Sequence, residues 1–210
     1  MLNLTDHMII WGGLFAHGDG STGLMKVVFC YALPTVVQGF DANETLHFRT
    51  TTFWAQLLFG GGGVTVWGCF SFDCRLDLYV LDGNLTGQKY RDFVLAPCVV
   101  SHFDNHALFM DDNGRPHRAR IVQHFLRQEA VQTIPWPVMS PDMNPIEHVW
   151  AFIGRKINQR NPKCQNIDEL RTAISQEWQQ FPQERLRRLV RSMTRRVTEL
   201  HNKRGGYTRY

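Results

Sequence analysis

The sequence contains no apolar run of the roughly 18 residues that a membrane-spanning helix needs, which predicts no transmembrane segment and no membrane partner. Its start has no basic stretch ahead of an apolar one and carries Asp6, so we expect no signal peptide. It also lacks internal repeats and low-complexity segments. With 210 residues, 43% hydrophobic and 20% charged, the chain has the composition of a globular protein of one large domain or two small ones.

Cysteine is scarce, and its spacing is irregular. The five cysteines include no CxxC pair, and their number is odd. This pattern argues against a disulfide framework and against a zinc cage, and it favours a reducing compartment. The glycine run at 60–63 is not followed by a lysine at the spacing of a phosphate-binding loop. We interpret that run as a loop entering a strand, and we expect no small-molecule cofactor.

Basic residues are few in the first part of the chain and many in the last. Residues 1–150 hold 9 Lys and Arg against 14 Asp and Glu, whereas residues 151–210 hold 14 against 5. The two balances, −5 and +9, give the net charge of +4. A basic C-terminal third indicates a polyanionic partner such as nucleic acid. The alternative is a solvated basic helix face, and charge alone does not separate the two.

The hydrophobic patterns predict strands first, then alternating strands and helices, then helices. Strands are expected at 25–33, 64–72, 76–84, 106–111 and 131–136, and helices at 86–103, 116–129, 145–158, 167–180 and 183–203. This order is typical of an α/β domain with a mixed sheet.

Apolar stripes predict which helix faces are buried. Residues 86–103 place Tyr90, Phe93, Val94 and Val99 on one stripe, and Pro97 should break or kink that helix. The 145–158 helix should pack on the sheet through Val149, Trp150 and Ile153. The last helix shows an inward stripe of Leu186, Leu189, Val190, Met193, Val197 and Leu200.

Glu147 lies in the stretch "SPDMNPIEHVW", and the pattern allows two interpretations of it. In the first, Asn144 is the N-cap, Pro145 begins the helix, and Glu147 closes a capping box on Asn144. In the second, the rigid proline-containing segment before the helix orients the Glu147 carboxylate, which binds a metal ion.

Asp111, Asp112 and Asn113 follow the strand "HALFM". Ligands tend to bind at the carboxyl ends of strands in α/β sheets, although Asn113-Gly114 is also a good turn pair. His117 should lie at the entry to the next helix, either near a site or as a solvent-facing or capping residue. The 34 residues between Asp112 and Glu147 form a path that can bring both carboxylates together. Carboxylates that converge on two Mg²⁺ ions make a centre for phosphoryl transfer.

The motif "DDNGRPHRA" followed by "SPDMNPIEHVW" resembles the mariner-like DDE transposases, as do "GGGGVTVWGCFS" and "LDG" followed by "KYRDFV". The resemblance spans about residues 60–160 and extends toward the final helices. It implies a ribonuclease-H-like fold and two activities, metal-dependent cutting of transposon ends and strand transfer into DNA. It also implies two Mg²⁺ ions and a homodimer. The expected location is the nucleus, with the cytoplasm as the alternative. By position, Asp112 is the second acidic ligand and Glu147 the third, with Asn113 and His117 beside the site.

The sequence departs from that family at its start. The family's first aspartate has no clear counterpart: counting back from "VTVWG" leads to Cys30 and Tyr31, which are not acidic. Asp19, 92 residues before Asp112, is our candidate for the first ligand. The chain should also begin too late to hold the family's helix-turn-helix region.

These observations predict three segments: a divergent N-terminal segment at 1–60, a catalytic core at 61–160 with a mixed sheet flanked by helices, and a C-terminal extension of basic helices at 161–210. On the last helix Arg188, Arg191 and Arg195 lie off the apolar stripe, where they should contact DNA. The alternatives to an active enzyme are a nucleic-acid-binding module without catalysis and a decayed transposon copy.

Overall fold

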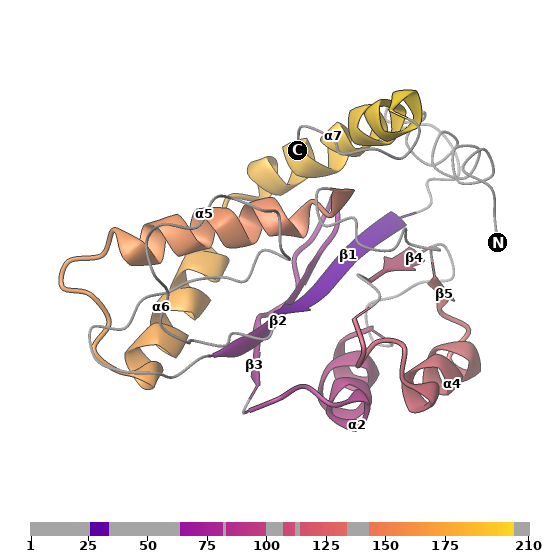
Figure 1. Ribbon diagram of the computed structural model, residues 1–210, viewed down its shortest axis with the longest axis horizontal. Helices are drawn as coiled ribbons and strands as arrows, with labels where there is room; N and C mark the ends of the chain where they lie inside the picture. The colour runs from indigo at the N-terminus through magenta and orange to yellow at the C-terminus, as the bar shows by residue number, and fades with distance from the viewer. Residues whose placement is uncertain are drawn as a thin grey trace.

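A five-stranded mixed sheet lies at the centre of the computed structural model (Figure 1). The structure describes residues 26–33, 64–81, 83–99, 107–111, 114–133 and 143–203. The strands are β1 (Lys26–Leu33), β2 (Thr65–Phe70), β3 (Tyr79–Leu81), β4 (Ala107–Met110) and β5 (Gln132–Thr133). Their order is β3-β2-β1-β4-β5, with β1–β2 and β2–β3 antiparallel and β1–β4 and β4–β5 parallel. The predicted mixed sheet is confirmed.

Two layers of helices enclose the sheet (Figure 1). The helices are α2 (Gly87–Lys89), the π-helix η1 (Tyr90–Val99), α4 (Arg120–Gln128), α5 (Ile146–Asn158), α6 (Ile167–Gln180) and α7 (Gln183–Asn202). Helices α5, α6 and α7 pack on one face, and η1 and α4 pack on the other. No helix in the described part of the chain is long and apolar enough to cross a membrane.

The side chains of β2 contribute to the hydrophobic clusters on both faces of the sheet, because successive side chains of a strand point to opposite faces. Val66 and Phe70 lie in the cluster formed with α5, α6 and α7. Trp67 and Cys69 lie in the cluster formed with η1 and α4. All six residues of β2 are buried, which fits a strand covered on both faces.

Two stacked tryptophans join α5 and α6 to the sheet. Trp150 of α5 and Trp178 of α6 lie with ring centroids 5.1 Å apart and an interplanar angle of 21°. They press on Gly68 of β2, where an added Cβ would come within 2.7 Å of Trp178 and 2.9 Å of Trp150. The Trp178 indole also donates a hydrogen bond to the Leu76 carbonyl at 3.0 Å. The absence of a side chain at Gly68 therefore makes room for the packing that holds both helices.

The C-terminal end of α6 is capped by a side chain from the sheet. Arg75 donates hydrogen bonds to the carbonyl oxygens of Gln179 and Phe181, two of the groups that a helix end leaves without a partner in the helix. Its guanidinium carbon also lies 5.8 Å from the Trp178 ring centroid. Burial lowers the pKa of Arg75, and nearby Asp77 opposes that shift.

The helix predicted at 86–103 is present, but its register differs from the prediction. Tyr90, Val94 and Leu95 are fully buried, whereas Phe93 is 60% exposed. The predicted stripe through Phe93 is therefore wrong. The segment is a π-helix, whose i→i+5 hydrogen bonds change which residues share a face. Pro97 lies within this helix and does not end it before Val99.

The cysteines differ from one another in state. Cys69, fully buried in β2, is disulfide-bonded, whereas Cys74 and Cys164 are free thiols. The partner of Cys69 lies outside the side chains that the structure describes. The sequence pattern therefore missed one disulfide bond, and the expected reducing compartment stays a prediction.

We predict that Gly68→Ala destabilises the domain by about 1–3 kcal/mol, because the new methyl group forces apart two buried rings that have no free space. Denaturant unfolding of the full chain measures this difference. The exposed variant Gln128→Ala should stay within about 0.5 kcal/mol of the parent. A Gly68→Ala protein as stable as this control would show that the ring pair is not tightly packed on β2.

Candidate active site

Glu147 lies in the first turn of α5, behind a capping asparagine. The helix begins at Ile146, and Pro145 before it already has helical φ and ψ angles of −67° and −22°. The Asn144 side-chain oxygen accepts a hydrogen bond from the Ile146 amide at 3.3 Å, as an N-cap residue does. The predicted N-cap at Asn144 is therefore confirmed, and the return bond from Glu147 to the Asn144 amide stays a prediction.

The next helix, α6, has a complete side-chain cap with the same residue spacing. At the start of α6, the Asn166 side chain accepts a hydrogen bond from the Glu169 amide at 2.9 Å. The Glu169 carboxylate in turn accepts bonds from the Asn166 side-chain nitrogen and the Gln165 amide, at 2.9 and 2.7 Å. Glu169 is exposed, as capping carboxylates usually are. Glu147 has the same spacing from a capping asparagine, but it is buried.

Burial is what sets Glu147 apart. It is 8% exposed and lies between Ile146 and Val149, both fully buried. Burying a carboxylate is costly unless it is paired or bound to a metal. The start of α5 offsets part of this cost, since the N-terminal end of a helix favours negative charge. The two interpretations of Glu147 are thus compatible: the carboxylate is buried behind a capping asparagine, and its role as a metal ligand stays a prediction.

Of the two consecutive aspartates after β4, the structure describes Asp111. Asp111 is 2% exposed and forms an ion pair with Arg118. Its charge is therefore already compensated by a neighbouring side chain. Asp112 and Asn113 lie outside the described residues, so the predicted approach of the Asp112 and Glu147 carboxylates stays a prediction.

His117 is a buried stacking residue. It is 2% exposed, and its ring lies 4.3 Å from the Tyr90 ring of η1 at an interplanar angle of 31°. Its carbonyl accepts a hydrogen bond from the Gln123 side chain at 2.9 Å. The solvent-facing alternative is therefore wrong. The turn that begins at Gly114 places the His117 ring against Tyr90 of η1.

The strand β1 supplies no acidic residue to this edge. It pairs in parallel with β4 in a register that ends at Phe29 beside Met110. The next positions along β1 are Cys30 and Tyr31, and the strand "KVVFCYAL" contains neither Asp nor Glu. This placement agrees with the count made from the sequence. Asp19 lies outside the described residues.

Arg196 is a buried cation that sequence reasoning missed. It is 2% exposed, lies on α7 and donates a hydrogen bond to the Ser192 hydroxyl at 3.0 Å. The sequence did carry a signal for this burial, because Arg196 follows Met193 by three positions and so borders the apolar stripe of α7.

His148 lies near this cation. Burial, together with Arg196 and Arg155, lowers the pKa of His148 to about 4. His148 is therefore neutral at pH 7.

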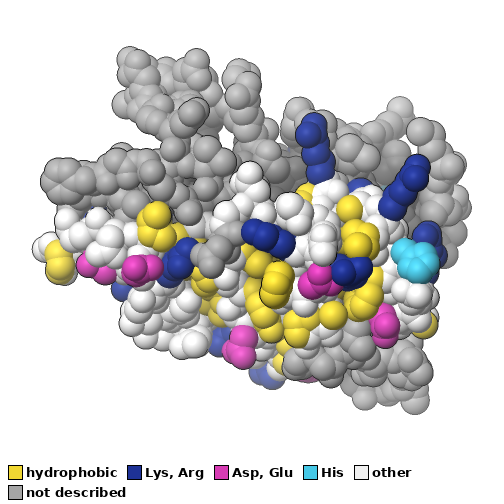
Figure 2. All heavy atoms as spheres, turned by 90° about the horizontal axis from the view of Figure 1, so that it is seen from below, with side chains coloured by type: hydrophobic (Ala, Val, Ile, Leu, Met, Phe, Trp, Pro, Cys, Tyr) yellow, Lys and Arg dark blue, Asp and Glu magenta, His cyan; other side chains and the backbone are white. Residues whose placement is uncertain are grey.

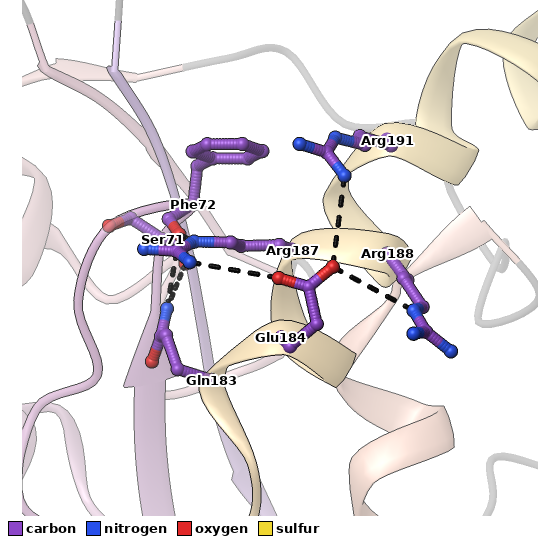
Figure 3. A network of polar contacts seen from close by, with 7 residues as sticks. All are labelled: Ser71, Phe72, Gln183, Glu184, Arg187, Arg188 and Arg191. Atoms are coloured by element: carbon purple, nitrogen blue, oxygen red, sulfur yellow. Dashed lines mark hydrogen bonds and ion pairs between the residues drawn. The ribbon is translucent and has the colours of Figure 1, made fainter.

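The first half of α7 is fixed to the loop after β2 by a polar and cation–π network (Figure 3). Gln183 donates hydrogen bonds to the carbonyls of Ser71 and Phe72, at 3.4 and 3.1 Å. Arg187 and Arg191 lie over the Phe72 ring, at 5.7 and 5.2 Å from its centroid. These contacts hold α7, and the arginines on it, in one position against the sheet edge.

Glu184 is shared by three arginines (Figure 3). Its carboxylate lies 3.6 Å from Arg187, 3.8 Å from Arg188 and 3.8 Å from Arg191. Side chains of Arg188 and Arg191 remain 74% and 62% exposed. One acid against three bases leaves this surface positive. The predicted DNA-binding residues Arg188, Arg191 and Arg195 are thus all exposed.

On the face seen from below in Figure 2, the Lys and Arg side chains of the described residues lie among hydrophobic and acidic ones.

The described residues contain no group of three His, Cys, Asp or Glu side chains able to hold a metal ion. Asp112 and Asp19 are outside that search. In chemical type, the Glu147 carboxylate fits Mg²⁺, which prefers hard oxygen ligands.

The sheet order and its two helical layers define an α/β domain of the ribonuclease-H-like class. Residues 61–171 match the family model described as DDE superfamily endonuclease, and the chain belongs to this family. The resemblance to mariner-like DDE transposases is confirmed.

Known proteins similar to the chain agree with this assignment. The Tc3 transposase of Caenorhabditis elegans is 27% identical over 93% of the chain and 61% of its own length. The Tcb2 transposase of Caenorhabditis briggsae is 30% identical over 72% of the chain and 56% of its own length. The chain thus spans about 60% of these relatives.

Among solved structures, the Mos1 transposase catalytic domain with Raltegravir and Mg superposes with a TM-score of 0.70, at 14% identity, over 99% of both chains. A Mos1 strand transfer complex superposes with a TM-score of 0.68 at 14% identity, over 99% of this chain and 64% of that one. At this identity, the likeness shows a shared fold.

We predict that the domain loses stability as the pH falls from about 6.5 to about 4. In that window the unfolded His148 takes up a proton, whereas the folded one, with a pKa of about 4, does not. The loss should be about 1–2 kcal/mol, allowing for partial solvent screening.

Denaturant unfolding at pH 7 and pH 5 in EDTA measures this loss, with His148→Gln as the comparison. The variant should show a smaller difference between the two pH values. Equal differences in the parent and the variant would remove His148 as the source.

Proposed function

We propose that the chain is a transposase-type DDE domain that binds DNA and carries out metal-dependent strand cleavage and transfer. The observation that carries the proposal is Glu147, a buried carboxylate in the first turn of a rigidly packed helix. It lies within the span matched by the endonuclease family.

Asp112 and Glu147 would hold Mg²⁺, with two ions when the site is complete. When bound, such ions activate the attacking oxygen and stabilise the leaving one in phosphoryl transfer. The chain's own part is to hold the carboxylates in place. Packing of Val149 and Trp150 fixes α5 and so fixes Glu147, while β4 leads directly to Asp112.

The third carboxylate decides whether the domain cleaves DNA. Since β1 contains no acid, Asp19 is the candidate that remains from the sequence. A site with only Asp112 and Glu147 would bind Mg²⁺ weakly. The second candidate function is accordingly a DNA-binding module without cleavage, favoured by Cys30 and Tyr31 at the position where β1 would carry the acid.

Partners and location follow from the same proposal. Solved Mos1 structures include a strand transfer complex and paired-end complexes with Mg and with Mn. By analogy we propose transposon DNA as the partner of this chain and a homodimer as its working form. DNA as substrate also supports a location in the nucleus.

We predict that the full chain nicks DNA carrying transposon ends only when Mg²⁺ or Mn²⁺ is present, and that Asp112→Asn and Glu147→Gln each abolish nicking. Each substitution keeps the side-chain volume and removes the charge that binds the metal. Gel analysis of labelled DNA measures the products. Glu169→Gln, in the α6 cap, is the matched control and should nick normally.

Asp19→Asn separates the two candidate functions. If Asp19 is the first ligand, this variant should lose nicking as well. A parent protein that binds DNA yet never nicks it, with either metal, would decide for the binding module.

We predict that DNA affinity depends on salt through the α7 arginines. Replacing Arg188, Arg191 and Arg195 with Ala should reduce the slope of log affinity against log salt by up to about 3, since each phosphate contact contributes roughly 0.9. Binding assays at several salt concentrations measure the slope. Glu184→Gln should strengthen binding by removing the shared acid. An unchanged slope in a folded triple variant would show that this surface is only solvated.

A further inference from the structure

Two cations from different helices lie over one aromatic ring. The ring belongs to Phe152, in the middle of α5, and it is half-buried. The Lys156 ammonium of α5 lies 5.8 Å from the ring centroid, and the Arg185 guanidinium carbon of α7 lies 4.7 Å from it. Phe152 in turn packs edge-on against the buried Phe181 ring, with the two centroids 5.1 Å apart. The ring therefore brings a lysine of α5 and an arginine of α7 together at the surface, where the two helices meet (Figure 1).

These cations lack the acidic neighbours that balance other bases of the same helical layer. Arg160, for example, pairs with Glu177 at 2.9 Å. Among the described residues, by contrast, no carboxylate lies within 4.0 Å of Arg155, Lys156 or Arg185, and all three side chains are exposed. Positive charges gathered without a counter-charge raise the local potential, which attracts a polyanion.

The cluster of Arg155, Lys156 and Arg185 continues the positive surface of α7. Arg185 and Arg188 are three positions apart on that helix, and residues at this spacing are neighbours on a helix surface. Arg188 is itself highly exposed. Arg155 and Lys156 belong to the last turn of α5, so they extend the surface from one helix to two.

We infer that Arg155, Lys156 and Arg185 form a second contact with the DNA backbone, in addition to the three arginines proposed on α7. This inference rests on the proposed function, in which DNA is the partner. Lysine and arginine bind phosphate through their charge and their N–H donors and do not read the bases, so the cluster should add affinity without sequence preference. Packing on Phe152 holds two of the three cations in place before DNA binds, which lowers the entropy cost of the contact.

Two simpler roles for these residues predict different results. Basic residues in the last turn of a helix stabilise it through the helix dipole, and cations over an aromatic ring stabilise the packing around that ring. If this were their whole role, removing them would lower the free energy of unfolding and leave DNA binding unchanged. If only the net charge of the protein mattered, removing cations would weaken DNA binding equally at any exposed position.

The test compares two double variants that lose the same charge. Arg155→Gln with Lys156→Gln removes two cations of the cluster. Arg120→Gln with Arg127→Gln removes two exposed cations from α4, which packs on the opposite face of the sheet. The affinity of the full chain for a DNA duplex of mixed sequence is measured at several salt concentrations, and denaturant unfolding checks that each variant is folded.

The cluster variant should reduce the slope of log affinity against log salt by up to about 2, since each phosphate contact contributes roughly 0.9. The α4 variant should change the slope by less than one contact. Arg185→Gln, which leaves α5 intact, should reduce it by about 1. An equal change in the cluster and α4 variants, or no change in the folded cluster variant, would overturn the inference.

The parent and the α7 triple variant, with Ala at Arg188, Arg191 and Arg195, separate this inference from the proposed function. If the slope falls in the triple variant but not in the cluster variant, only the second contact fails. If the parent has no measurable affinity for the duplex at any salt concentration, the proposed DNA partner fails, and the second contact fails with it.

Discussion

The packing of Trp150 and Trp178 on Gly68 is the constraint on which the rest of the structure depends. It joins α5, α6 and β2 at one point where no side chain can be added to the strand. Arg75 strengthens the same junction by capping α6 and lying beside Trp178. Because α5 is held here, three residues after Glu147, packing fixes the first turn of the helix together with the cap at Asn144.

Only one of the two proposed carboxylates lies in the described residues. Glu147 comes from a helix held by large aromatic contacts. The α7 arginines form a separate positive surface, fixed by Phe72 and moderated by Glu184 (Figure 3). In the proposed function, the carboxylates hold the metal and the α7 surface attracts the polyanion.

Periodicity in the sequence predicted the mixed sheet, α6 and the buried stripe of α7, because each has strong apolar spacing over many residues. It failed at Phe93, since a π-helix shifts the face that the α-helical period assumes. The predicted N-cap at Asn144 is present at the start of α5, but the spacing alone did not predict that Glu147 is buried whereas Glu169, at the same spacing from Asn166, is exposed. Contacts between distant residues had no local signal, as the hydrogen bond from Trp178 to the Leu76 carbonyl shows.

The location of metal ions tests the central claim most directly. Crystals of the full chain grown with Mn²⁺ and measured for anomalous scattering would locate the metal without reference to activity. We expect an anomalous peak coordinated by both Asp112 and Glu147. A well-ordered site with no peak there, or with the two carboxylates more than about 10 Å apart, would contradict the account, because one two-metal centre cannot span that separation.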